Sequence, residues 1–203
     1  MPRRVLKRGE AYKADLLLVD LDHGPTVVKD FHHKRTWVRL AGRLQVAREC
    51  RAYRWLGTLS GVPRFYGRID AHALAFEHLA GRPLGTAPDR AQGGSEKLRR
   101  LREVIDRLHA RGLVHWDLRA RENVLVDATG TIYVLDFASA MWLRPGGLAH
   151  RLLFGWMRRI DESAYLKWKQ LLGAGPYTPE EQAFLRRFHA WRPLWPFRRG
   201  RRQ

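Results

Sequence analysis

Residues 113–138 read LVHWDLRARENVLVDATGTIYVLDFA, and this stretch decides how the rest of the chain is interpreted. It contains two short apolar runs, VLV and IYVL, which the turn DATG separates, and this pattern predicts a pair of strands. Asp117 and Asn123 come before the first run, and Asp136 follows the second. We therefore expect the two carboxylates and the amide to converge at the ends of neighbouring strands.

These three side chains suit phosphoryl transfer. One carboxylate can orient and deprotonate an attacking hydroxyl, while a second carboxylate and an amide oxygen hold Mg²⁺ on the phosphates of ATP. Both acids stand beside apolar residues, where an unpaired carboxylate is costly without a metal or a hydrogen-bond partner. Asp117 is predicted to act on the hydroxyl, and Asn123 and Asp136 are predicted to bind Mg²⁺.

A second pair of charged residues lies upstream. Lys29 belongs to the run TVVKDF, a predicted strand, and Glu49 lies between Trp37 and Leu56, where apolar residues recur at helical spacing. A strand lysine paired with a helix glutamate is the usual way to fix an ammonium on the α- and β-phosphates. The alternatives are a solvated strand lysine and a surface ion pair, because the same helix carries several arginines.

In their order, these residues resemble the protein-kinase-like superfamily from about Gly9 to Ala140. The resemblance places V-V-K at the strand-lysine motif, and it assigns the strand lysine to Lys29, its helix partner to Glu49, the catalytic aspartate to Asp117, the catalytic-loop asparagine to Asn123 and the D-F-G aspartate to Asp136. The chain looks most like small bacterial RIO-like and lipopolysaccharide-kinase-like proteins, whose H-x-D-L loop has its asparagine one residue later than usual. The resemblance implies ATP and Mg²⁺ as cofactors.

Further residues would complete a nucleotide site under this resemblance. Gly9 stands in the turn-like GEA, a shortened relative of a RIO-type phosphate loop, for which an ordinary turn is the alternative. Glu77 and Leu79 bound the segment EHL, a hinge whose backbone would pair with adenine. Arg119 would reach the γ-phosphate, and His115 would orient the loop by hydrogen bonding.

The chain also departs from the kinase pattern. No G-x-G-x-x-G occurs near the N-terminus, Trp116 replaces the arginine that commonly reads a phosphorylated activation loop, and Ala138 replaces the glycine of D-F-G. No A-P-E element follows, and the chain after Asp136 is too short for a full substrate lobe. These departures argue against a conventional regulated protein kinase. They keep a nucleotide-binding pseudokinase, acting as a binding module, as the alternative to an active enzyme.

The pattern as a whole predicts one α+β domain, a two-lobed protein-kinase-like fold with a small antiparallel-sheet N-lobe and a truncated helical C-lobe. We expect an N-lobe over about 1–80, a connector over about 81–94, a C-lobe over about 95–190 and a basic aromatic tail over 191–203. Helices are expected over 95–109, with Ser95 as N-cap, and over 148–159, 161–172 and 179–190.

The charge balance indicates a polyanionic partner. The 203 residues include 38 Lys and Arg against 20 Asp and Glu, a formal net charge of +18. Trp195, Phe197 and the arginines that follow suit an anionic membrane interface, and they also suit stacking and phosphate contact on RNA. We favour the membrane face for this tail. A plain RNA-binding protein is the least favoured alternative, because no RRM or KH signature is present and arginines are spread over every segment.

The cysteine content and the distribution of apolar residues limit the possible site types and the expected cellular location. A single cysteine, Cys50, excludes an intramolecular disulfide framework and a cysteine-based zinc cluster. The sequence contains no apolar run long enough to span a membrane, and its first residues do not resemble a signal peptide. We expect a cytoplasmic protein, compatible with a peripheral position at the inner face of the cytoplasmic membrane. The acceptor stays open between a lipopolysaccharide-core sugar and a protein Ser or Thr, and the oligomeric state is undetermined.

Overall fold

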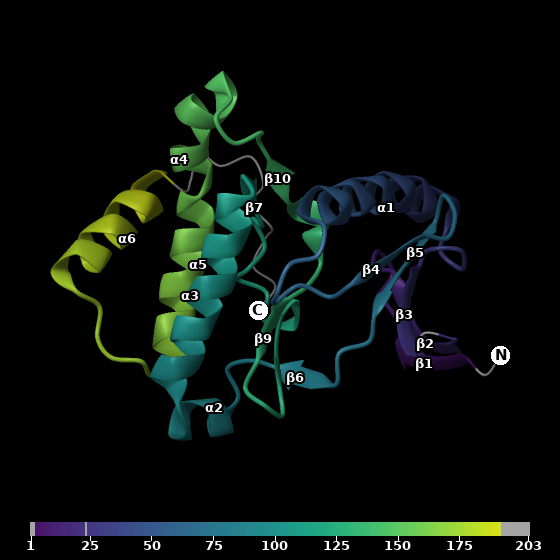
Figure 1. Cartoon of the computed structure of the whole chain (residues 1–203), viewed down its shortest axis with the longest axis horizontal. Coiled ribbons are helices and arrows are strands. Elements are labelled where there is room, and N and C mark those ends of the chain that lie inside the picture. The colour runs from purple at the N-terminus through teal and green to yellow at the C-terminus, as the bar shows by residue number, and fades with distance from the viewer. Residues whose placement is uncertain (1–2, 23, 192–203) are drawn as a thin grey trace.

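The computed structural model describes residues 3–22 and 24–191 and consists of a strand-rich half followed by a helix-rich half (Figure 1). The strands are β1 (Arg3–Lys7), β2 (Asp15–Leu21), β3 (Gly24–Asp30), β4 (Phe65–Arg68), β5 (Ala73–Glu77), β6 (Gly81–Pro83), β7 (Leu113–Val114), β8 (Val124–Asp127), β9 (Ile132–Val134) and β10 (Met141–Trp142). The helices are α1 (Thr36–Leu56), α2 (Ala87–Ala91), α3 (Gly94–Ala110), α4 (Gly155–Met157), α5 (Arg159–Leu171) and α6 (Pro179–Trp191). Two 3₁₀ turns, Arg121–Asn123 and Phe137–Ser139, and a π-helical turn, His150–Phe154, complete the fold.

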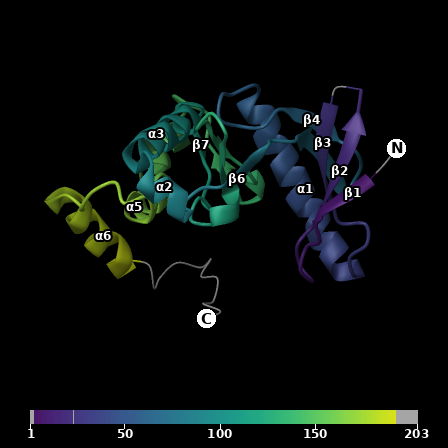
Figure 2. The same cartoon turned by 90° about the horizontal axis from the view of Figure 1, so that it is seen from below.

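The first half is one antiparallel sheet with a helix beside it (Figure 2). The strand order is β1-β2-β3-β5-β4, so β3 is the middle strand, and Lys29 pairs with a residue of β2 and a residue of β5. α1 buries most of the apolar face that its helical spacing predicts, whereas Leu44 on that face is 69% exposed. Val46 and Cys50 of α1 share a small core with Phe31 at the end of β3 and Leu74 of β5. This packing fixes α1 relative to the strand that carries Lys29.

The second half is built around two long helices, α3 and α5, which lie side by side (Figure 1). Their core contains the fully buried Trp168 and Leu101, and the β8–β9 hairpin packs against α3 through Ile132. β6 pairs with β8, so the predicted connector contains a strand and a short helix, α2, rather than irregular chain. The predicted α+β, two-lobed layout is confirmed.

Two local expectations in the C-terminal half need correction. Helix α3 begins at Gly94 after an N-cap at Gly93, whose φ of 74° is left-handed, so the predicted cap at Ser95 is wrong. A side chain at Gly94 would overlap the carbonyl oxygen of Leu172, which explains the glycine at this close approach. The helix predicted over 148–159 contains the π-helical turn before α4.

The tail predicted over 191–203 lies, apart from the backbone of its first residue, outside the described residues. Within residues 3–22 and 24–191, we find no helix that combines the length and the apolar character needed to cross a membrane.

Candidate active site

Lys29, on the middle strand of the N-terminal sheet, reaches two carboxylates. Its Nζ lies 2.8 Å from Oε2 of Glu49 on α1 and 2.9 Å from Oδ1 of Asp136, which follows β9. The side chains of Lys29 and Glu49 are 9% and 1% exposed, whereas that of Asp136 is 40% exposed. The structure thus brings together three of the predicted site residues, in a cluster that opens to solvent on the side of Asp136.

Burial and charge act against each other in this cluster. Burial favours the uncharged form of Lys29, but the carboxylates of Glu49 and Asp136 outweigh it and raise the pKa of Lys29 above its ordinary value. Burial raises the pKa of Glu49 to about 7, although Lys29 opposes the effect. Burial also raises the pKa of Asp136, but the charge and hydrogen bond of Lys29, together with His115 and the N–H of Ala138, outweigh burial and lower this pKa below its ordinary value. Asp136 is therefore the carboxylate that stays ionised at neutral pH.

The backbone at Asp136 adopts a conformation that is rare for a residue with a side chain. Its φ is 63°, and its Oδ1 accepts a hydrogen bond from the N–H of Ala138 at 3.3 Å. Ala138 itself lies in the 3₁₀ turn Phe137–Ser139, and Phe137 is fully buried against Tyr53 of α1. The left-handed residue is therefore the aspartate, and the turn accommodates an alanine where D-F-G has glycine. Strained backbone of this kind is concentrated at functional sites.

The loop that carries Asp117 is tied to the residue before Asp136. The Nε2 atom of His115 lies 2.9 Å from the carbonyl oxygen of Leu135, and Nδ1 of His115 accepts the N–H of Asp117 at 3.2 Å. The amide of Asn123 donates to the carbonyl oxygen of Asp117 at 3.0 Å and to its Oδ2 at 3.3 Å. The N–H of Leu135 in turn donates to the carbonyl oxygen of Asn123 at 2.9 Å. These bonds hold Asp117 and Asn123 beside the start of the Asp136 turn.

The donor set at this place suits Mg²⁺, which prefers carboxylate and amide oxygens. Asp136 supplies a partly exposed carboxylate whose pKa is lowered, and Asn123 uses its nitrogen for Asp117, so its Oδ1 is the atom suited to a metal. Both are the residues that the sequence predicts as magnesium ligands.

Asp161 in the first turn of α5 supports the same loop and has no counterpart among the predicted residues. Its carboxylate is fully buried and accepts the backbone N–H of His115 at 2.8 Å and that of Trp116 at 2.9 Å. It also lies 3.1 Å from Nε2 of His109. Trp116 has a φ of 64°, so Asp161 stabilises a strained backbone immediately before Asp117. The sequence does not distinguish Asp161 from other acidic residues in the first turn of a helix, where acids are common because they interact favourably with the helix dipole.

Two cationic side chains meet at the Asp117 loop. Nη1 of Arg119 donates to the carbonyl oxygen of Ser163, and the carbonyl oxygen of Arg119 accepts from Nζ of Lys167 at 2.5 Å. Burial, followed by Arg119 and Arg121, lowers the pKa of Lys167, and Asp117 acts in the opposite direction. The sequence predicts Arg119 as the cation for the γ-phosphate, whereas Lys167 comes from a distant helix and no motif marks it.

The turn between β1 and β2 contains Gly9, and one of its side chains contacts the C-terminal half of the chain. Asp15 holds this turn from inside, because its Oδ1 accepts the N–H of Gly9 at 2.8 Å and the ammonium of Lys34 at 2.7 Å. A Cβ atom at Gly9 would overlap two facing carbonyl oxygens, so the turn requires glycine. Nζ of Lys13 lies 3.2 Å from Oε1 of Glu122, which joins the turn to the Asp117 loop. A phosphate contact at Gly9 stays a prediction.

The predicted hinge lies where the N-terminal sheet passes into β6. The N–H of Glu77 pairs with the carbonyl oxygen of Arg64 at 2.9 Å, and the N–H of His78 pairs with that of Pro25 at 3.2 Å. The carbonyl oxygen of Leu79 accepts the N–H of Gly81. The segment is thus anchored on both sides, and adenine recognition by Glu77 and Leu79 stays a prediction.

Comparison with known proteins gives a partial similarity. Over 78 residues, 38% of this chain, the sequence is 33% identical to the serine/threonine-protein kinase PSK1 of Saccharomyces cerevisiae. The match covers 5% of that protein, so the chain corresponds to a small part of this curated relative. No protein-family model matches the chain. The partial similarity and the two-lobed layout both point to kinase-like proteins.

Proposed function

We propose that this protein is an ATP- and Mg²⁺-dependent phosphotransferase that transfers the γ-phosphate of ATP to a hydroxyl group. The observation that carries the proposal is the buried ammonium of Lys29, held between Glu49 and Asp136. An ammonium fixed in this way is suited to the α- and β-phosphates of ATP. The loop of Asp117 is bonded to the residue next to Asp136, which supports one common site for nucleotide and acceptor.

Each residue then has a defined role in the transfer. Asp117 orients the acceptor hydroxyl and takes its proton, while the acceptor oxygen bonds to the γ-phosphorus and the bond from that phosphorus to the ADP oxygen breaks. Asn123 and Asp136 would hold Mg²⁺, which neutralises charge on the phosphate oxygens when it is bound. Arg119 and Lys167 place positive charge at the same loop, where charge develops on the γ-phosphate. Gly9, Glu77 and Leu79 complete the nucleotide site.

Within the kinase-like proteins, we place the chain nearest the small RIO-like and lipopolysaccharide-kinase-like group. The support is the loop HWDLRAREN, with its asparagine one residue later than in common kinases. A sugar hydroxyl of a membrane glycolipid is the acceptor that we favour. A protein Ser or Thr is the second candidate, because the partial relative is by name a serine/threonine-protein kinase.

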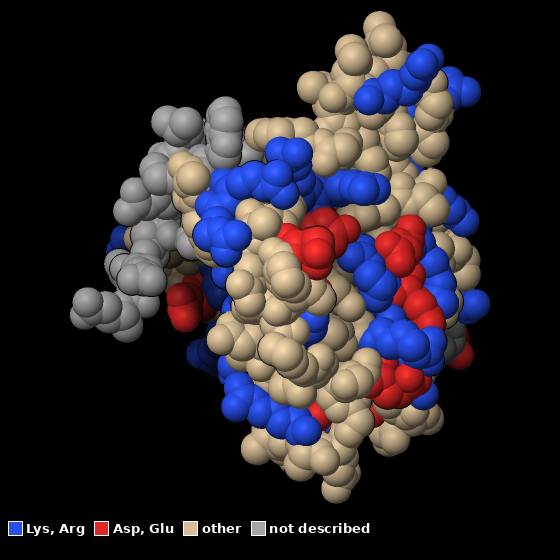
Figure 3. All heavy atoms as spheres, turned by 90° about the vertical axis from the view of Figure 1, so that its left-hand side faces the viewer, with Lys and Arg blue, Asp and Glu red and all other residues tan. Residues whose placement is uncertain are grey.

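The preference for a membrane acceptor comes from a segment that we call the projecting segment, residues 148–157. It exposes four large apolar side chains, namely Leu148, Leu152, Leu153 and Trp156, which are 72%, 69%, 52% and 50% exposed. No acidic residue occurs between Asp136 and Asp161, whereas four arginines do. Figure 3 shows the projection at the top of the molecule as tan and blue spheres, with no red. Apolar side chains flanked by arginine match an anionic membrane interface.

The projecting segment also lies close to the proposed chemistry. Phe154 and Met157, on its inner side, form a small core with Val114, and Trp116 packs against that core. Trp116 directly precedes Asp117, so a membrane bound at this segment would bring a glycolipid hydroxyl toward Asp117. We therefore propose a peripheral position at the cytoplasmic face of a membrane, where ATP is available.

The decisive experiment uses γ-labelled ATP, Mg²⁺ and a bacterial extract that contains membranes and cytosol. Products are separated into glycolipid and protein fractions, with Asp117→Asn and Asp136→Ala as variants. We expect label in the glycolipid fraction, a loss of about 10²-fold or more with Asp117→Asn, and unchanged binding of ATP by that variant. Label in the protein fraction alone would replace the glycolipid by a protein acceptor.

The same samples separate an enzyme from a binding module. Parental protein that transfers no label, but whose melting temperature rises with Mg²⁺ and ATP, would be a nucleotide-binding pseudokinase. Full transfer by Asp117→Asn would remove Asp117 from its proposed role.

A further inference from the structure

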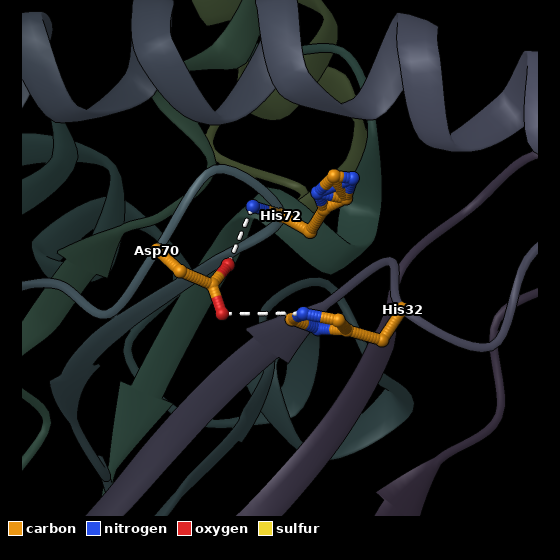
Figure 4. Close-up of side chains that lie close together, drawn as sticks. All are labelled: His32, Asp70 and His72. Atoms are coloured by element: carbon orange, nitrogen blue, oxygen red, sulfur yellow. Dashed lines mark hydrogen bonds and ion pairs between the residues drawn. The ribbon is translucent and has the colours of Figure 1, made fainter.

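A second cluster of metal-ligating groups lies outside the proposed phosphotransfer site. His32 follows β3, and Asp70 and His72 belong to the turn between β4 and β5 (Figure 4). One ligand atom from each of these three residues lies within 4.8 Å of the other two. The two segments are joined in addition by a backbone hydrogen bond from Phe31 to His72, so the cluster is part of the sheet framework.

Hydrogen bonds to neighbouring residues orient two of the three side chains, those of His32 and Asp70. In each, one atom stays available to coordinate a metal ion. Nδ1 of His32 lies 2.6 Å from Oδ1 of Asp30, which fixes the ring and presents Nε2 on the other side. Oδ1 of Asp70 accepts the N–H of His72 at 2.6 Å and that of Ala73 at 3.1 Å, which presents Oδ2. A carboxylate behind a metal-binding histidine is a regular feature of metal sites, since it sets the tautomer and the ring orientation.

The two presented atoms have the spacing of neighbouring ligands on one ion. Nε2 of His32 and Oδ2 of Asp70 are 3.2 Å apart. Metal–ligand bonds of about 2.0–2.1 Å in a tetrahedral zinc site place adjacent ligand atoms about 3.3 Å apart. Figure 4 shows His32 and Asp70 pointing toward each other, with the ring of His72 next to them.

The ring of His72 lies beside that of His32. The rings of His32 and His72 are 5.2 Å apart between centroids and are inclined by 26°. A ring nitrogen of the partly buried His72 lies within 4.8 Å of the ligand atoms of the other two residues.

We propose that His32, Asp70 and His72 bind one transition-metal ion of the zinc type. Two imidazoles and a carboxylate suit Zn²⁺, and a group of three protein ligands leaves a position for water. The bound ion would clamp the end of β3 to the β4–β5 turn. Because β3 also carries Lys29, this clamp would stiffen the strand that positions the ammonium.

The test is a calorimetric titration of the full chain, purified without a polyhistidine tag and freed of metal by a chelator, with Zn²⁺ alone as the probe. We expect one ion per chain and a weakening of at least about tenfold in Asp70→Asn and in His72→Gln. Asp70→Asn keeps an acceptor for the two backbone N–H groups, so the turn is retained. His33→Gln, an exposed neighbour outside the cluster, is the matched control and should bind like the parent.

Two further variants make the result specific. Asp30→Asn removes the group behind His32 and should weaken binding by about 10–100-fold, whereas Asp136→Ala should leave Zn²⁺ binding unchanged. Binding that Asp70→Asn and His72→Gln do not alter, or that His33→Gln weakens as strongly, would overturn the site. The titration needs neither ATP nor an acceptor, so its failure would leave the proposed phosphotransfer untouched.

Discussion

At the scale of single residues, the candidate site contains one positively charged side chain and two acidic ones, and this imbalance sets the protonation of the two acids. One ammonium, Lys29, is shared by two carboxylates, so the cluster keeps a net negative charge when both acids are ionised. Glu49, the more buried acid, bears the desolvation cost, and its pKa rises to about 7. Asp136 stays ionised and faces solvent, where a metal ion would supply the missing positive charge. The two acids therefore have different roles although they share one partner.

The pKa of Glu49 leads to a prediction about pH. As the pH rises through about 7, Glu49 loses its proton and holds Lys29 as an ion pair, so the KM for ATP should fall. Initial rates of phosphotransfer between about pH 5.5 and pH 8.5 measure this effect. In Glu49→Gln we expect this step to disappear and the KM to be about tenfold higher at alkaline pH. Identical pH profiles for the two proteins would contradict the assignment.

The raised pKa of Glu49 also determines whether its contribution to the free energy of unfolding rises or falls with pH. The pKa of Glu49 is about 7 in the folded chain, against an ordinary value of 4.5. The folded state therefore binds more protons between these two values, and the contribution of Glu49 to the free energy of unfolding falls as the pH rises through that window.

At the scale of elements, the contact between α1 and β3 controls the distance from Glu49 to Lys29. Gly42 of α1 faces the ring of Phe31, which directly follows β3 and is 1% exposed. A Cβ atom at Gly42 would lie 2.6 Å from Cγ of Phe31, well inside normal contact distance. Glycine here allows the helix to approach the strand, and this approach brings Glu49 to the lysine.

The substitution Gly42→Ala tests this packing. We expect it to lower the free energy of unfolding by about 1–3 kcal/mol, because overpacking must move the ring or the helix. Phosphotransfer should fall with it, since the displaced helix carries Glu49. The matched control is Gly155→Ala in α4, where an added Cβ meets nothing within 4 Å. The control should gain about 0.5–1 kcal/mol from helix propensity. Urea unfolding measures both, and equal effects would disprove the close-approach explanation.

At the scale of the whole molecule, charge and exposed apolar surface coincide. The chain carries a net charge of +18, the projecting segment presents four large apolar side chains, and no acidic residue occurs between Asp136 and Asp161. α5 continues from this segment and supplies Asp161 and Lys167 to the Asp117 loop. One helical unit thus connects the proposed membrane contact to the proposed chemistry.

Membrane binding can be measured without any substrate. The full chain should sediment with vesicles of phosphatidylcholine that contain about one third phosphatidylserine, and less with phosphatidylcholine alone. The double variant Leu152→Ser with Trp156→Ser should weaken binding by about tenfold or more, because two apolar side chains no longer insert. Ile69→Ser, at an exposed apolar residue of the β4–β5 turn, is the control. If the control loses as much binding as the double variant, the projecting segment is not the contact.

Much of the architecture could be predicted because the buried faces of helices and strands require apolar residues at regular spacing in the sequence. Helical spacing between Trp37 and Leu56 predicts α1, and the apolar runs around Asp127 predict the β8–β9 hairpin. The start of α3 is predicted less well, because its cap is the left-handed Gly93 and not Ser95. The close approach of Gly94 to the carbonyl oxygen of Leu172 depends on tertiary packing and leaves no local pattern.

A strand-rich half followed by a helix-rich half could be predicted from the sequence. So could five candidate site residues, since each of Lys29, Glu49, Asp117, Asn123 and Asp136 stands at a recognisable place on or beside a strand or helix. The tertiary structure alone decided the support of that site. Asp161 and Lys167 reach the Asp117 loop from α5, and His32 meets Asp70 and His72 from another strand. The physical reason is that periodic burial is a local property of the chain, whereas pairing between distant side chains depends on how the finished elements pack.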